Sequence, residues 1–104
     1  MHPNFQPYYA VIFTSTLTET IEGYSEMANA MEELAAQQPG YIDFESARSD
    51  LGITISYWDS LEAISNWKSQ LEHQKAQELG RSKWYASYKV RVCKVERDYE
   101  FTSS

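Results

Sequence analysis

The residues best suited to binding a ligand lie on one predicted helix, which spans 60–79. On a helical wheel, the centre of its apolar stripe is formed by Leu61, Ile64, Leu71 and Leu79. Trp67 lies at the margin of this stripe, and the neighbouring polar side carries Asn66, Gln70, His73 and Gln77. Trp67 therefore has two interpretations: the wall of a cleft for a flat aromatic compound, or a tryptophan at the edge of the core.

His73 also has two interpretations. An imidazole pKa of about 6.5 would let it transfer a proton or bind a ligand near neutral pH. Its position on the wheel, away from the apolar stripe, instead predicts a side chain in solvent. The second histidine, His2, lies in the leader and is expected to have no role.

Several other chemistries lack their parts. The sequence contains no glycine-rich phosphate loop, no His-Glu-x-x-His pattern and no Gly-x-Ser-x-Gly elbow. Cys93 is the only cysteine, which excludes an intramolecular disulfide and a multi-cysteine metal site. Nine basic and fifteen acidic residues give a net charge of −6, which repels phosphate backbones and anionic membranes. We therefore expect a cytoplasmic protein that binds no nucleic acid, no membrane and no metal.

The apolar patterns predict four strands and two helices. Strands are expected at 8–17, 41–47, 53–57 and about 86–99, with the second and third forming a hairpin. The first helix is expected to be capped among Thr18–Thr20 and to run to Gln37, and the second runs from Ser60 to Leu79. In the last strand the apolar parity switches between Val92 and Cys93. A bulge there, or a strand that leaves its sheet to pair with another subunit, would explain the switch.

This order of elements is typical of a ferredoxin-like α+β sandwich, β-α-β-β-α-β, with both helices on one face of an antiparallel four-stranded sheet. The expected division is an extended leader at 1–7, one domain at 8–100 and a tail at 101–104. The second face of the sheet would be bare. We therefore expect a homodimer that packs through this face and part of the last strand, from Val90 to Tyr99.

The stretch from Gly52 to Arg81 resembles the antibiotic biosynthesis monooxygenase family. A β-rich run ends in Trp58, Asp59-Ser60 signals a helix start, and the helix carries Trp67. In that family a strand likewise ends in a tryptophan, and the next helix carries a tryptophan over a cleft. The resemblance implies that two such domains pack into a dimeric α/β barrel.

One branch of this family degrades haem with an asparagine on the first strand, a tryptophan on the second helix and an iron-binding histidine ten residues later. Trp67 matches the tryptophan. Gln77 stands ten residues later, however, and the middle of the first strand offers Thr14–Thr16 and no asparagine. The resemblance therefore does not extend to haem degradation, and we expect no cofactor.

Another branch oxidises polycyclic phenols with O₂ and without metal or flavin, because the bound phenolate reacts directly with O₂. By this resemblance the residues expected to contact substrate are Trp67, Tyr57, Gln70, Gln77 and Tyr88. The candidates for positioning or deprotonating the phenol are His73, Asn66 and Arg81. We therefore expect a monooxygenase acting on a flat aromatic, phenolic or quinol-type compound. The alternative is a non-catalytic ligand-binding or stress-response dimer on the same fold.

Overall fold

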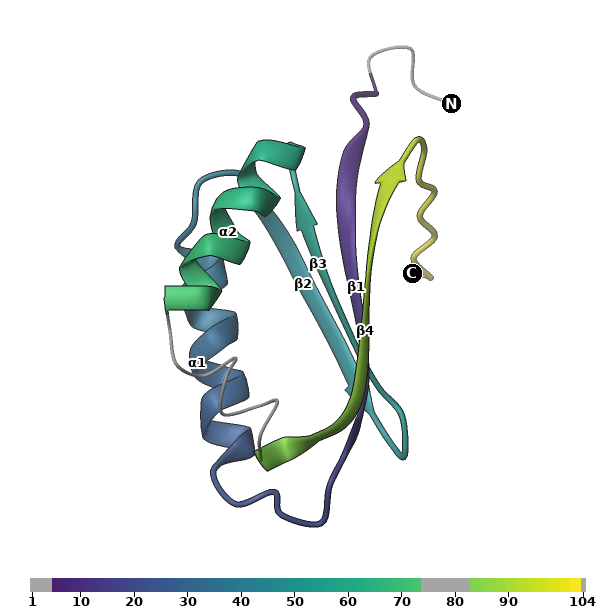
Figure 1. Cartoon of the computed structure of the whole chain (residues 1–104). Helices are drawn as coiled ribbons and strands as arrows, with labels where there is room; N and C mark the ends of the chain where they lie inside the picture. The colour runs from purple at the N-terminus through teal and green to yellow at the C-terminus, as the bar shows by residue number, and fades with distance from the viewer. Residues whose placement is uncertain (1–4, 74–82, 104) are drawn as a thin grey trace.

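The computed structural model describes residues 5–73 and 83–103, with the side chains of residues 72 and 73 left out. Its six elements are β1 (Tyr8–Leu17), α1 (Tyr24–Ala36), β2 (Tyr41–Arg48), β3 (Gly52–Trp58), α2 (Leu61–His73) and β4 (Tyr85–Val95). The strands form one antiparallel sheet in the order β2-β3-β1-β4, and both helices lie on the same side of it (Figure 1). This arrangement confirms the predicted ferredoxin-like α+β sandwich.

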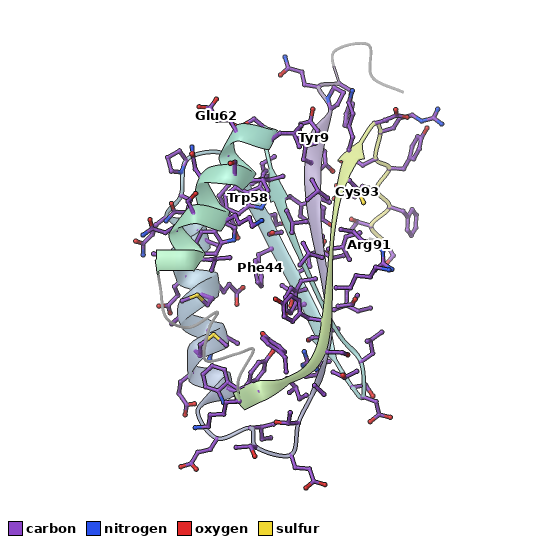
Figure 2. The ribbon with its side chains drawn as sticks, in the orientation of Figure 1. Tyr9, Phe44, Trp58, Glu62, Arg91 and Cys93 are labelled. Carbon is purple, nitrogen blue, oxygen red and sulfur yellow. The ribbon has the colours of Figure 1, made fainter. Side chains whose placement is uncertain are left out.

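The two faces of the sheet follow from strand alternation. Trp58 packs on α2, so the residues two and four positions before it, Ser56 and Thr54, also face the helices. Tyr57 and Ile55 face the other way. We call these two sides the helix face and the outer face. In Figure 2, Trp58 points from the sheet toward α2, and Arg91 of β4 points away from the helices.

The core lies between β3 and the two helices. Its buried members are Ala35, Trp58, Ala63 and Trp67. The rings of Trp58 and Trp67 stack with their centroids 5.9 Å apart and their planes at 26°. Leu61, expected at the centre of the α2 stripe, is instead 56% exposed. The buried stripe of α2 runs through Ala63 and Trp67, which are one turn apart, and this placement corrects the marginal position expected for Trp67.

The predicted start is correct for α2 and wrong for α1. Ser60 precedes α2 and its hydroxyl oxygen accepts a hydrogen bond from the Ala63 N–H at 3.1 Å, which confirms the predicted start signal. The cap predicted for α1 among Thr18–Thr20 is wrong. Gly23 occupies the N-cap with φ of 85°, and the Thr18 hydroxyl donates to the Lys83 carbonyl at 2.7 Å. The connection after β1 is therefore tied to the start of β4 and does not enter the helix.

The bulge predicted between Val92 and Cys93 is also wrong. Pairing of β4 with β1 is regular from Val95 to Ser87, and the register shifts only at the other end, next to Leu17. Val92 lies on the helix face opposite Val11, and Cys93 lies on the outer face opposite Ala10. The parity switch arises because β4 carries apolar residues on both faces.

Gly40 marks the closest approach between the start of β2 and the start of α2. Its φ is 86°, a left-handed conformation that favours glycine. A Cβ at this position would lie 2.5 Å from the Cβ of Ala63 and 2.6 Å from the Asp59 carboxylate. Only glycine lets this connection pass so near α2, and the approach sets the spacing of α2 from the sheet.

Candidate ligand cleft

A cleft of about 450 Å³ opens between α1 and the helix face of β2 and β3. On α1 its wall is formed by Tyr24, Ser25, Ala28, Asn29 and Glu32. On the strands its wall is formed by Phe44, Ser46, Ala47, Arg48 and Thr54. Figure 2 shows Phe44 on the side of the sheet that faces the helices. The cleft thus combines two aromatic rings with six polar or charged side chains.

Arg48 is fixed in this wall by a path across the sheet. It pairs with Gly52 on β3, and Gly52 pairs in turn with Ser15 on β1. The Arg48 side chain crosses Gly52 and donates to Ser15 twice, from Nη1 to the carbonyl oxygen at 3.3 Å and from Nη2 to the hydroxyl. A Cβ on residue 52 would overlap the guanidinium group. Glycine at this position is therefore what allows the arginine to reach its partner.

The ring of Tyr24 lies against the Arg48 guanidinium. The Arg48 Cζ lies 5.5 Å from the centroid of the Tyr24 ring, within the range of a cation–π contact, and Nη2 donates to the Tyr24 hydroxyl at 3.4 Å. Tyr24 packs edge-on against Tyr85 at 5.9 Å between centroids. Burial raises the pKa of Tyr85, the neighbouring Tyr24 raises it further, and the positive charge of Arg48 opposes part of this rise. Tyr85 therefore keeps its proton at neutral pH.

The aromatic group continues along the helix face of β1 and β4. Phe13 stacks on Tyr88 at 5.3 Å between centroids with an interplanar angle of 19°, and it meets Tyr85 edge-on at 5.3 Å. Tyr88 was expected to contact substrate. It lies on the helix face opposite Ser15, which is the end of the sheet where Arg48 is anchored.

The structure separates the other residues expected at the site. Trp67 is 8% exposed and stacks in the core, while Tyr57 lies on the outer face and donates to Glu45 at 2.7 Å, so the two are not walls of one cleft. Asn66 is exposed on α2, and Gln70 is half-buried there. The His73 side chain, Gln77 and Arg81 lie outside the described residues.

Sequence reasoning missed Arg48 and Phe44. Arg48 falls just beyond the strand predicted at 41–47, but it is the last residue of β2. The available signal was the glycine at position 52, which stands directly opposite Arg48 in the hairpin and leaves room for a long side chain. Phe44 lies within a predicted strand, but the alternation of side chains along one strand does not show which face of the sheet the helices cover.

Two further properties bear on the classes of site. In the part of the chain that the structure describes, no three His, Cys, Asp or Glu side chains are grouped as a metal site would require. Among the same residues, no helix combines the length and the apolar character needed to cross a membrane.

Comparison with known proteins gives concordant matches. A family model described as antibiotic biosynthesis monooxygenase matches residues 7–79. The chain is 55% identical over 97 residues to the uncharacterized protein YqjZ of Bacillus subtilis (strain 168), covering 91% of this chain and 85% of that protein.

Solved structures with a similar fold share little sequence with this chain. A variant of SnoaB, a cofactor-independent oxygenase from Streptomyces nogalater, superposes with a TM-score of 0.75 at 12% identity, covering 88% of this chain and 95% of SnoaB. A putative antibiotic biosynthesis monooxygenase from Nitrosomonas europaea superposes with a TM-score of 0.69 at 15% identity, covering 86% of this chain and 91% of that chain. At these identities the likeness concerns the fold.

Proposed function

Because the chain belongs to the antibiotic biosynthesis monooxygenase family, we propose that it is a small monooxygenase that oxidises a flat aromatic, phenolic or quinol-type compound with O₂ in the cleft between α1 and the sheet. The observation that carries this proposal is the composition of the cleft. Its volume of about 450 Å³ falls within the range usual for small-molecule sites, and the rings of Phe44 and Tyr24 line it. These rings offer flat surfaces on which an aromatic substrate can stack.

The proposed reaction needs only the organic compound and O₂. A phenol that has lost its proton is a good electron donor, so it can pass electrons to O₂ directly. When a ring methylene becomes a carbonyl, one oxygen atom enters the product and the other leaves as water with the two hydrogens of the methylene. The protein's part is to hold the compound, exclude water and position the proton of the phenol.

Several residues can share these tasks. Tyr85 packs edge-on against Tyr24 of the cleft wall, and its protonated hydroxyl is a hydrogen-bond donor. Asn66 and His73 on α2, together with Arg81, remain our proposed candidates for positioning or deprotonating the phenol. Tyr88, Gln70 and Gln77 remain proposed substrate-binding residues. Trp67 packs in the core and Tyr57 lies on the outer face, so in this proposal neither contacts a substrate held in the cleft.

We also propose that two copies pack through the outer face into a dimeric α/β barrel. On that face Ile53 is 40% exposed, and it lies beside Ile55 and Tyr57 along β3. The same interface would include the segment from Val90 to Tyr99. Light scattering should give twice the chain mass at micromolar concentration, and a mass of one chain would refute this part of the proposal.

An exposed free thiol at Cys93 is consistent with a reducing, cytoplasmic location.

Oxygen uptake in the presence of hydroxylated anthrones, which carry the ring methylene, tests the activity, and the corresponding anthraquinones, which lack it, are the control. The expected result is O₂ consumption in proportion to product, with Phe44→Ala raising KM. The matched control is Phe101→Ala, because Phe101 is 88% exposed in the C-terminal segment and should leave KM unchanged. Binding of every tested phenol without O₂ uptake would contradict the proposal and favour the non-catalytic alternative. A stable complex with one haem per chain would contradict the absence of a haem cofactor.

A further inference from the structure

We infer that Arg48 binds a negatively charged oxygen of the ligand, so that the cleft selects flat aromatic compounds that carry an ionised hydroxyl or a carboxylate. The inference rests on the proposed function for the location of the ligand. It adds the charge of the ligand and the residue that recognises it. Arg48 belongs to the strand wall of the cleft, as does Phe44 four residues earlier on the same strand.

The first argument is the charge of Arg48. Its recorded bonds within residues 5–73 and 83–103 go to the Ser15 carbonyl, the Ser15 hydroxyl and the Tyr24 hydroxyl. All three acceptors are neutral, so these bonds position the guanidinium without neutralising it. They use three of its five N–H groups. The group at Nε and the second one at Nη1 are left for a ligand, as far as the described residues show.

The second argument is that the guanidinium is held before any ligand arrives. Ser15 is 1% exposed and lies on β1, on the far side of β3 from Arg48. Its carbonyl and hydroxyl oxygens both accept hydrogen bonds from the guanidinium. Gly52 lies beneath the side chain and the Tyr24 ring lies 5.5 Å from Cζ. A flexible arginine would lose side-chain entropy on binding, and this one has already lost much of it. Such preorganisation is typical of a recognition residue.

The third argument concerns the shape of the ligand. The two N–H groups left on Arg48 lie on Nε and Nη1, which share no edge of the guanidinium, so each can donate to one charged oxygen such as that of a phenolate or carboxylate. With its charged oxygen at Arg48, an aromatic ring system extends along the strand wall toward Phe44. On the opposite wall Glu32 is a hydrogen-bond acceptor, which suits a second, protonated hydroxyl. A neutral aromatic hydrocarbon would offer neither of these charged groups a hydrogen-bonding atom.

A matched pair of probes tests the inference without turnover. The compound 2-hydroxy-1,4-naphthoquinone is an anion at neutral pH, and its 2-methoxy ether has the same ring system without charge. Under anaerobic conditions, the wild-type protein should bind the anion at least about tenfold more tightly than the ether, as expected for a charge-assisted hydrogen bond. A third probe, 2-naphthoate, shows whether a carboxylate serves as well as an ionised hydroxyl.

Variants assign the preference to Arg48. Arg48→Gln should remove the preference for the anion and leave binding of the ether within about twofold. Lys68→Gln removes one positive charge from an exposed position on α2 and should keep the preference. Gly52→Ala retains the arginine but pushes its guanidinium away from Ser15, so it should also reduce the preference. Arg48→Lys keeps the charge but loses the planar guanidinium that Ser15 and Tyr24 hold in place, so it should fall between wild type and Arg48→Gln. Thermal melts establish that each variant is folded.

Equal binding of the anion and the ether by wild type, or an unchanged preference in folded Arg48→Gln, would overturn the inference. These outcomes are separable from failure of the proposed function. If the anion binds through Arg48 and no O₂ is consumed with any substrate, the recognition role stands and the monooxygenase proposal fails. If O₂ uptake proceeds equally well in Arg48→Gln, the monooxygenase proposal stands and the role of Arg48 fails.

Discussion

Replacing Trp67 by alanine should destabilise the protein strongly, because the structure makes this residue half of a stacked pair in the core. Trp67 is 8% exposed, Trp58 is fully buried, and their ring centroids lie 5.9 Å apart. Truncating a buried tryptophan lowers the free energy of unfolding by about 3–5 kcal/mol. This figure includes the loss of the stacking interaction with Trp58. A domain of this size loses roughly 4–8 °C of melting temperature per kcal/mol. Trp67→Ala should therefore melt at least about 12 °C below wild type.

The measurement is urea unfolding followed by circular dichroism, at one fixed protein concentration because association also affects stability. Phe101→Ala is the control, since Phe101 is 88% exposed and lies outside the proposed interface, so its truncation should cost less than about 0.5 kcal/mol. Trp67→Phe keeps a ring in place and should cost less than Trp67→Ala. A loss of under about 1 kcal/mol for Trp67→Ala would refute the core placement and restore the interpretation of Trp67 as a cleft wall.

Three further predictions concern single contacts. Gly40→Ala should lower the free energy of unfolding in urea more than Gly23→Ala does. Both glycines have φ near 85°, but a Cβ at residue 40 would overlap Ala63, whereas a Cβ at residue 23 would have its nearest neighbour at 3.6 Å. Equal losses in the two variants would contradict this account. The hydrogen bond to Asp98 and then desolvation raise the pKa of Tyr8 from 10 to about 12, so the stabilisation is complete below pH 10 and is lost as the pH rises through about 12. In an ultraviolet titration Asp98→Ala should shift one tyrosine toward pH 10, and an identical titration curve would argue against the bond. Ser60→Ala removes the cap of α2 and should cost about 1 kcal/mol, measured against Ser65→Ala on the exposed face of the same helix; equal losses in the two variants would show that the cap contributes nothing.

Much of the fold was predictable because local patterns and global packing agree. The bounds predicted for β1 match the structure, since alternation on an aromatic and β-branched segment leaves little choice of strand. The start of α2 was also predicted correctly from Ser60. The first helix was misplaced because Thr18 satisfies its hydroxyl with the distant Lys83 carbonyl, a partner that sequence spacing does not show.

The cleft was less predictable for a physical reason. A helical wheel weights large side chains, so Leu61 outranked Ala63, although the close approach of Gly40 favours a small residue facing the sheet. The position of Arg48 depends on the pairing of three strands, two of which are joined by hydrogen bonds between distant parts of the chain. Periodicity within one strand carries no information about that pairing.

The path of Arg48 across Gly52 to Ser15 also has an evolutionary consequence. The glycine is required only while an arginine crosses it, and the serine is a useful anchor only while the guanidinium reaches it. Substitutions at positions 15, 48 and 52 should therefore be epistatic, so that a relative without arginine at 48 tolerates a larger residue at 52. Covariation of these three positions among relatives would mark the lineages that keep the same ligand chemistry, even where overall identity is low.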